Sequence, residues 1–313
     1  MIFDGHSDIL TALTQFVQKG EAQPFTDHYL QTFVQGQVEG AIFALWADPA
    51  QKLPLAEQIA QQLQALHYLL KEERVFQLIL GQKDLEPAGA QGKLYCLLGA
   101  EGLDGYSQEE AAIAWLYQQG VRHVGLTWNY ANQFAAGVLD CGGLTALGKR
   151  AVKRIQQSAM LLDISHLNDA SAADVLRLAQ GPILASHSNC RRLCGHPRNL
   201  TDDQIKAVAA TGGVVGINSY PLFIAETKQQ QNLHHLADHI VHMADLAGVE
   251  AVGFGFDFNY WDTAADAVIL PDLHQYSQVP RLLELLKQRG FHDSELQQIC
   301  HGNFLRLLRE VLA

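Results

Sequence analysis

The sequence predicts an α/β protein, most simply a closed (β/α)8 barrel formed by a single domain that covers residues 1–313. Three observations carry this prediction. Eight apolar runs recur along the chain, each is followed by a segment with helical periodicity, and histidines and acids gather where the runs end. Nearly continuous hydrophobic strands that alternate with helices are typical of a parallel sheet covered by helices. A doubly wound open sheet is the alternative.

The composition is that of a globular protein. The chain has 313 residues, of which 48% are hydrophobic, and a formal net charge of -11. It can therefore bury a large core, and its acidity argues against a nucleic-acid surface. No basic segment precedes a hydrophobic stretch, and no apolar run approaches the roughly 18 to 20 residues that span a bilayer. We therefore expect a cytoplasmic protein without a membrane partner. The five cysteines lack the paired spacing of a structural zinc site, so we expect reduced thiols.

The first unit starts at the amino terminus. Residues 1–10 read as a strand that contains His6 and Asp8, and this spacing places both side chains on one face, where they can hold one metal ion. Residues 11–36 are mixed and polar, and we expect a helix or two there. The run 40–46 is bounded by glycine and by Asp48-Pro49, which indicates a buried strand. Residues 55–73 then repeat apolar residues at helical spacing.

The same strand-then-helix unit recurs six times. The paired ranges are 93–102 with 108–119, 121–129 with 145–159, 160–166 with a helix from about 168, 182–187 with 201–210, 213–218 with 233–247, and 250–257 with helices from about 279. The glycine-rich segment 137–143 has neither a following Lys-Ser or Lys-Thr nor Rossmann spacing, so we predict no nucleotide site.

Polar residues that suit metal binding end five of the predicted strands. They are His6, Asp8, Glu101, His166, His187 and Asp257. In a barrel these strand ends share one rim. Three imidazoles and three carboxylates exceed the needs of one tetrahedral zinc with an open position, so two metal ions that share a carboxylate fit better. Such ions, about 3.5 to 4 Å apart, make hydroxide available at neutral pH, and a remaining carboxylate can carry its proton to a leaving amine.

Short motifs surround these residues along nearly the whole chain. They are Asp4-Gly5-His6-x-Asp8, Glu101-Gly102, Gly143-Leu144-Thr145 through Leu162-Asp163-Ile164-Ser165-His166-Leu167, Ala185-Ser186-His187-Ser188, Arg198-Asn199-Leu200 and Gly253-Phe254-Gly255-Phe256-Asp257-Phe258. Taken together and in this order, they resemble the membrane (renal) dipeptidase family of zinc metallopeptidases, in the amidohydrolase superfamily.

The resemblance implies a binuclear zinc site with two Zn²⁺ per chain, for which Co²⁺ or Mn²⁺ can substitute. By this likeness His6 and Asp8 bind the first zinc, and Glu101 bridges both ions. His166 and His187 bind the second zinc.

The resemblance also implies roles around the substrate. Asp257 corresponds to the acid that hydrogen-bonds the bridging water and protonates the leaving nitrogen. Arg198 corresponds to the arginine that receives the substrate's C-terminal carboxylate, which a guanidinium matches with two parallel hydrogen bonds. Trp128 stands where mammalian members carry a histidine after Leu-Thr, and an indole donates one hydrogen bond but binds no metal. Trp128 and Asn129 end the fourth strand and Tyr220 follows the seventh, so we expect these three to contact substrate.

The sequence therefore predicts a zinc-dependent dipeptidase that uses a metal-bridging hydroxide on small dipeptides. The resemblance implies tolerance of a D residue at the C-terminal position and favours a homodimer. Trp128 keeps open an alternative, a binuclear amidohydrolase that acts on N-acyl amino acids, lactones or cyclic amides. A barrel that binds peptide or metal without turnover would lack ligands, yet all five are present. Residues 259–260 are Asn-Tyr, where members of the family that the chain resembles usually carry Asp-Gly. We expect this difference to reshape the loop over the pocket.

Several other polar residues have simpler expected roles. Four histidines crowd the predicted helix 233–247, namely His234, His235, His239 and His242. The last three share one face, and we expect that face to be solvated because no acid completes a metal cavity there. His123 begins the fourth strand and is expected to pack in the core. Asp163 is either a hydrogen-bond partner of a metal ligand or a satisfied core acid.

Overall fold

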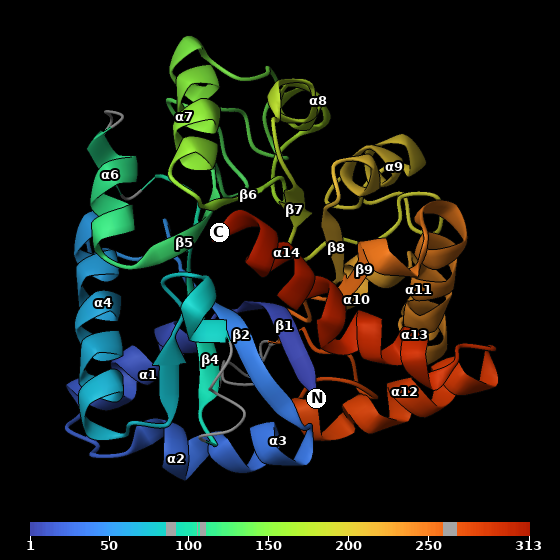
Figure 1. Cartoon of the computed structure of the whole chain (residues 1–313), viewed down its shortest axis with the longest axis horizontal. Coiled ribbons are helices and arrows are strands. Elements are labelled where there is room, and N and C mark those ends of the chain that lie inside the picture. The colour runs from blue at the N-terminus through green and yellow to red at the C-terminus, as the bar shows by residue number, and fades with distance from the viewer. Residues whose placement is uncertain (86–91, 105, 107–110, 259–267) are drawn as a thin grey trace.

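The computed structural model of the chain describes residues 1–85, 92–104, 106, 111–258 and 268–313 (Figure 1). The predicted loop change at 259–260 lies outside the described residues, as do residues 108–110 of the predicted helix 108–119. Within the described ranges, strands and helices alternate in the predicted order.

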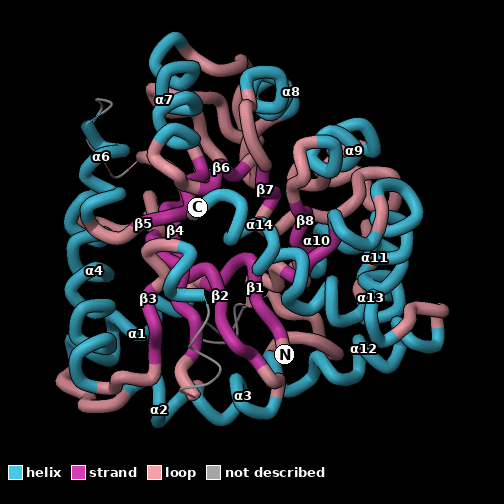
Figure 2. The backbone as a smooth tube through the Cα atoms, viewed as in Figure 1, coloured by secondary structure: helices cyan, strands magenta, loops and turns pink. Residues whose placement is uncertain are grey.

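The strands in the described ranges form one parallel sheet. They are β1 (Ile2–Ser7), β2 (Val38–Leu45), β3 (Phe76–Leu78), β4 (Leu94–Glu101), β5 (Val121–Gly125), β6 (Leu161–Asp163), β7 (Ile183–Ala185), β8 (Val214–Ile217) and β9 (Val252–Phe254). Eight of them close in the order β2-β1-β9-β8-β7-β6-β5-β4, because β2 also pairs with β4. Figure 2 shows the strands at the centre with the helices around them. The predicted (β/α)8 barrel is confirmed, and the open sheet is excluded.

The short strand β3 is absent from the sequence-based prediction. It pairs with the first half of β4, where Phe76 is in register with Leu94. β5 pairs with the second half, from Leu98 onward. A run of three residues is too short for a strand periodicity to stand out in the sequence.

Most of the helices lie between successive strands and surround the barrel, and the last three follow the last strand (Figure 1). They are α1 (Ile9–Gln18), α2 (Pro24–His28), α3 (Leu30–Gln35), α4 (Leu55–Glu72), α6 (Ala111–Gln118), α7 (Ala146–Gln157), α8 (Asp169–Leu178), α9 (Asp202–Ala210), α10 (Pro221–Ile224), α11 (Leu233–Ala247), α12 (Val279–Gln288), α13 (Asp293–Gln297) and α14 (Asn303–Val311). Thr145, Asn168 and Thr201 each cap a helix by accepting a backbone N–H three residues on, which explains why these starts were predictable.

Two apolar clusters stabilise the barrel. One lies between the strands and the surrounding helices. The other joins the first halves or the middles of strands to α14, and it includes Phe3, Ile42, Leu97, Leu161, Leu184 and Val214 with Phe304, Leu307 and Leu308. Figure 1 shows α14 crossing this end of the barrel. The amino end of the barrel is therefore closed by apolar packing, and the carboxyl ends of the strands remain for chemistry.

Across the described residues, every helix falls short of the length or the apolar character that crossing a bilayer requires.

The solvated face predicted for the histidines of α11 is wrong for His239. This side chain is fully buried. Its Nδ1 accepts the backbone N–H of Cys190 at 3.0 Å, and its Nε2 donates to the carbonyl of Ile224 at 2.9 Å. Burial lowers the pKa of His239 to about 4, so the ring is neutral at pH 7. His242 lies 2.9 Å from Asp202 of α9. Spacing alone identified the shared helix face, but the neighbours that cover it come from other parts of the chain.

Candidate metal centre

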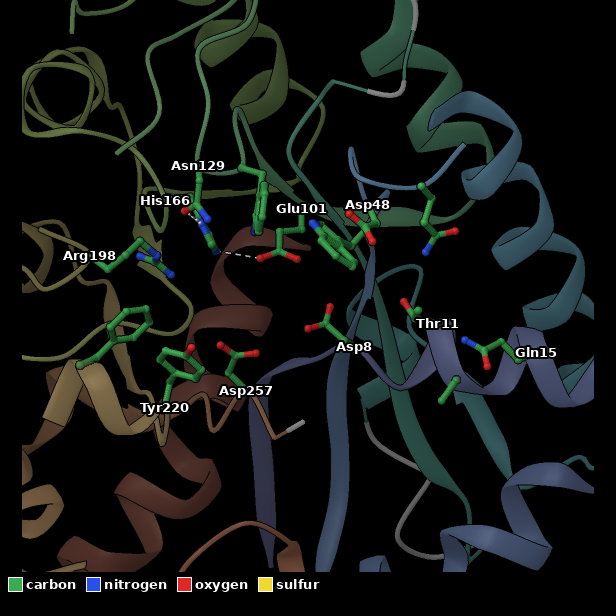
Figure 3. A pocket seen from close by; sticks show the side chains of 15 residues that line it. Asp8, Thr11, Gln15, Asp48, Glu101, Asn129, His166, Arg198, Tyr220 and Asp257 are labelled. Atoms are coloured by element: carbon green, nitrogen blue, oxygen red, sulfur yellow. Dashed lines mark hydrogen bonds and ion pairs between the residues drawn. The ribbon is translucent and has the colours of Figure 1, made fainter. Parts of the chain in front are cut away.

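Six polar side chains lie at or just after the carboxyl ends of five barrel strands. His6 lies on β1 and Asp8 follows it, Glu101 ends β4, His166 follows β6, His187 follows β7 and Asp257 follows β9. Figure 3 shows His166, Glu101, Asp8 and Asp257 facing one cavity. The fold therefore brings the six residues selected from the sequence to one rim.

Glu101 stands at the centre of this cluster. Its Oε1 lies 2.8 Å from Nε2 of His166 and 3.6 Å from Nε2 of His187. Its Oε2 lies 3.7 Å from Nε2 of His6, which in turn lies 3.5 Å from Oδ1 of Asp8. Oε1 of Glu101 thus faces His166 and His187, and Oε2 faces His6.

Two overlapping groups of side chains have the spacing of metal ligands. The ligand atoms of His6, Glu101 and His187 lie within 4.8 Å of one another, and so do those of His6, Asp8 and Asp257. Nε2 of His6 and Oδ1 of Asp8 are buried and make no hydrogen bond with the described residues. Buried polar atoms without partners are costly, so these two atoms are suited to a ligand.

The ring of His166 is oriented by Asn129. Nδ1 of His166 donates a hydrogen bond to Oδ1 of Asn129 at 2.8 Å. Because Nδ1 carries the proton, Nε2 keeps its lone pair and directs it toward Glu101.

The ring of His187 is oriented by a buried chain of hydrogen bonds. The Ser186 hydroxyl donates to Oδ2 of Asp163, so its oxygen accepts from Nδ1 of His187 at 2.7 Å. Asp163 also accepts from Nε2 of His123 at 2.9 Å and from the backbone N–H of Ser165 at 2.9 Å. Burial alone would raise the pKa of Asp163, but these donors lower it to about 2. The ionised Asp163 therefore fixes the tautomer in which Nε2 of His187 has a free lone pair.

The charge states of His166 and His187 suit a cation. Burial lowers the pKa of His166 and of His187 well below 6.5, so both rings are neutral, as metal ligands must be. Burial would also lower the pKa of His6, but the charges of Glu101 and Asp8 outweigh it and raise that pKa. Burial raises the pKa of Glu101 to about 8, against the opposing effect of His6 and with the help of Asp8. A bound cation would stabilise the ionised carboxylates.

The donor set fits divalent cations. Imidazole nitrogen and carboxylate oxygen are ligands that zinc, cobalt and manganese all accept. Nε2 of His166 and Nε2 of His187 lie 2.8 Å apart, each with a lone pair, and a cation between such atoms would relieve their repulsion. His6 and Asp8 supply further donor atoms that no described group uses.

Two residues of the cluster have unusual backbone conformations. His166 has a φ of 68° and Asp257 a φ of 55°, in the left-handed region that non-glycine residues rarely adopt. Such conformations cost on the order of 1–3 kcal/mol each and concentrate at functional sites. The backbone N–H of Val138 donates to the carbonyl of His166 at 2.8 Å, and Nδ2 of Asn218 donates to Oδ2 of Asp257 at 3.0 Å. Neighbouring elements thus hold both residues in place.

A cavity of about 520 Å³ opens over the cluster. Its lining includes Arg198, Trp128, Asn129 and Tyr220, the four residues selected from the sequence for substrate contact. Arg198 is buried, donates from Nη2 to the carbonyl of His187 at 3.3 Å, and has an Nε without a described partner. Burial lowers the pKa of Arg198 to about 10, so it stays charged at neutral pH. A buried cation with unused donors suits an anionic group of a ligand.

The whole sequence, residues 1–313, matches the family model of the membrane dipeptidases, peptidase family M19. The chain belongs to family M19. It is therefore an enzyme of the metallodipeptidase family.

The M19 assignment agrees with individual relatives. An uncharacterised protein from the pqqA 5′ region of Klebsiella pneumoniae is 33% identical over 264 residues, which cover 80% of this chain and 95% of that protein. Human dipeptidase 3 is 26% identical over 329 aligned positions, which cover 99% of this chain and 65% of that protein. This chain thus spans less than two thirds of the human relative's length.

Solved structures share the fold of this M19 chain. A metallopeptidase from Rhodobacter sphaeroides, liganded with a phosphinate mimic of the dipeptide L-Ala-D-Ala, matches with a TM-score of 0.87 and 25% identity over 99% of both chains. The metallopeptidase dipeptidase AC, also of family M19, matches with a TM-score of 0.89 and 24% identity over 99% of this chain and 98% of that chain.

The cavity over the metal-ligand cluster is also lined by residues that the sequence did not single out. Trp46 and Asp48 follow β2 and line the cavity, and Phe223 of α10 does so as well. Asn218 follows β8 and orients Asp257. Examination of every strand end, whatever residue type stood there, would have found Asp48 and Asn218. In the sequence, Asp48 precedes Pro49, and this pattern indicates only a turn.

Trp128 lies between the cavity over the metal-ligand cluster and a second cavity of about 270 Å³. Both cavities are lined by Trp128 and Glu101. The second is mainly apolar, with Leu45, Ala47, Pro49, Leu55, Ile59, Tyr106 and Tyr130 in its wall. The Trp128 ring lies 5.4 Å from that of Trp46 and 6.1 Å from that of His166, measured between centroids. Trp128 therefore forms a wall beside the candidate ligands.

Proposed function

We propose that this M19 enzyme is a zinc-dependent dipeptidase that binds two divalent cations per chain. His6 and Asp8 would hold one cation, His166 and His187 the other, and Glu101 both. The observation that carries the proposal is the meeting of these five side chains at one rim, with both neutral imidazoles directed at one oxygen of Glu101. Cobalt or manganese could occupy the same donors.

The remaining residues would divide the work of hydrolysis. Two cations held in this way would supply Lewis acidity and would make hydroxide available at neutral pH. Asp257 would take the proton of that nucleophile and deliver it to the leaving amine, a general acid-base task. Burial raises the pKa of Asp257, with His6 opposing and Asp8 reinforcing the shift. Asn218 holds the carboxyl in orientation through its 3.0 Å hydrogen bond.

Arg198 would bind the C-terminal carboxylate of the dipeptide. Its buried guanidinium is a charged donor in the cavity wall, and its planar geometry matches a carboxylate. Tolerance of a D residue at the C-terminal position is supported by the R. sphaeroides relative, which was solved with a mimic of L-Ala-D-Ala. Asn129, Tyr220 and Trp128 would contact the substrate along the same wall.

One observation favours a second candidate function. Trp128 adjoins both the metal-centre cavity and the mainly apolar cavity. An enzyme for N-acyl amino acids, lactones or cyclic amides could place an apolar group against this wall.

The two functions are separated by assaying purified protein of known zinc content against dipeptides and against N-acyl amino acids, lactones and cyclic amides. We expect two metal ions per chain, hydrolysis of dipeptides, loss of activity on chelation and recovery when zinc is returned. Turnover of acylated amino acids without turnover of any dipeptide would instead establish the second function. We also propose that the enzyme is a homodimer, which light scattering after size-exclusion chromatography would test. The cytoplasmic location stays a prediction.

A further inference from the structure

The cavity has charged groups of opposite sign on its two sides. Figure 3 shows Arg198 on one side and Asp48 on the other, with Glu101 between them. A dipeptide is a zwitterion with its carboxylate at one end, its ammonium at the other and the scissile bond between them. If the carboxylate binds Arg198 and the scissile bond lies at the metal centre, the ammonium extends toward Asp48.

Asp48 has acceptor capacity that the described residues leave unused. Oδ1 accepts the backbone N–H of Ala50 at 2.8 Å. No ion pair joins Asp48 to a described lysine, arginine or histidine, and neither candidate metal-ligand group among the described residues includes it. It is half-buried and lines the cavity, so its carboxylate is accessible to a ligand. Thr11 and Gln15 supply neutral polar groups on the same side (Figure 3).

The loop that carries Asp48 is held by two buried glutamines of α4. Gln58 accepts the backbone N–H of Asp48 at 2.9 Å and donates to its carbonyl at 3.0 Å. One turn later, Gln62 binds the backbone of Trp46 in the same way, at 3.1 Å and 2.5 Å. Because both ends of the Trp46–Asp48 segment are fixed, the backbone that carries the Asp48 side chain has little entropy left to lose on binding.

We propose that Asp48 binds the α-ammonium group of the substrate's N-terminal residue and so selects dipeptides with a free amino terminus over N-acylated compounds. This inference rests on the proposed dipeptidase function and adds a specificity determinant to it. An ammonium group donates charge-assisted hydrogen bonds to a carboxylate, and an acylated nitrogen has no charge to offer. The other three carboxylates that the described residues contribute to the cavity, Asp8, Glu101 and Asp257, belong to the candidate metal centre.

The test combines an enzyme variant with a substrate variant. Asp48→Asn removes the charge but keeps an oxygen that accepts the Ala50 N–H. The substrate pair starts from the dipeptide with N-terminal alanine, Ala-X, that the wild type hydrolyses fastest. Its partner is propionyl-X, in which a hydrogen atom replaces the α-amino group of the alanine. We expect Asp48→Asn to raise KM for the dipeptide about tenfold or more and to leave kcat within about twofold. The KM for the propionyl compound should not change.

Glu57→Gln is the matched control, because Glu57 is an exposed acid of α4 outside the cavity lining and its loss changes the net charge equally. Its kinetics should equal those of the wild type. An unchanged dipeptide KM in Asp48→Asn, or an equal rise for both substrates, overturns the inference while the dipeptidase function stands. Failure of the wild type to hydrolyse any dipeptide overturns both. Should Asp48→Asn not fold, Asp48→Ser takes its place. In addition, a wild-type preference below about tenfold for the dipeptide over the propionyl compound overturns the inference without any variant.

Discussion

Asp163→Asn is expected to weaken metal binding although Asp163 contacts no candidate metal ligand directly. In the native protein, Nδ1 of His187 donates to Ser186, and Ser186 donates to Asp163. An asparagine can present its NH2 group to Ser186, and the serine hydroxyl then donates to Nδ1 of His187. The proton of His187 must move to Nε2, which can no longer bind a cation.

The magnitude of this effect follows from the hydrogen bonds of Asp163. Oδ1 accepts the backbone N–H of Ser165 at 2.9 Å and of Ser186 at 3.0 Å, and Oδ2 accepts His123 at 2.9 Å and the Ser186 hydroxyl. With the asparagine NH2 group facing Ser186, His123 loses its acceptor while the Ser186 hydroxyl turns to His187. At 1–3 kcal/mol for one lost acceptor, we expect the free energy of unfolding to fall by about 2 kcal/mol. Metal affinity should fall about 10- to 100-fold, the usual cost of losing a ligand's hydrogen-bond partner.

The assays are a competition titration of metal against a chelator and urea unfolding of the same samples. Glu73→Gln is the control, because Glu73 accepts the backbone N–H of Phe25, that of Thr26 and the Thr26 hydroxyl outside the metal centre. That variant should lose stability and keep its metal affinity. If Asp163→Asn loses stability and still binds metal as tightly as the wild type, the hydrogen-bond chain does not control the tautomer of His187.

Three further predictions concern single residues. Asp257→Asn should lower kcat about 10²- to 10⁴-fold because the proton carrier is lost, with the zinc content measured in parallel; a lower zinc content would show a ligand role instead. Arg198→Lys keeps the charge but loses the planar pair of donors, so KM for dipeptides should rise about tenfold, and an unchanged KM would contradict carboxylate binding there. Burial depresses the pKa of His239 from 6.5 to about 4, so its stabilising contribution is complete above pH 6.5 and is lost progressively as the pH falls from 6.5 toward 4. The unfolding free energies of wild type and His239→Gln should therefore approach each other by about 2 kcal/mol between pH 7 and pH 5, whereas a constant difference would show that burial does not shift this group.

Much of the candidate site was predictable because strand ends in a parallel barrel share one rim. Once residues 93–102 and 182–187 are identified as strands, Glu101 and His187 must face the same opening. Their chemistry then indicates a metal. Asp48 and Asn218 also follow strands, but an acid before a proline and a single asparagine carry little information without their neighbours. Asp48 becomes significant only because it lies across the cavity from Arg198.

For His239, by contrast, the sequence pattern predicts the wrong environment. Its spacing and its polar character indicate a side chain exposed to solvent, yet it is buried on the face of α11 that meets Cys190 and Ile224. These two residues are 49 and 15 positions away in the sequence. Local pattern determines which face of a helix a residue occupies, and the packing of remote segments determines what that face meets.

The sequence by itself determined the alternation of strands and helices, the barrel and the family, because hydrophobic periodicity and short motifs are local properties of the chain. Only the tertiary structure decided which nitrogen of each histidine faces Glu101, how Asp163 reaches His187 through Ser186, and which carboxylate lies opposite Arg198. These features depend on distances between side chains that lie 20 to more than 100 residues apart, and the closure of the barrel fixes those distances.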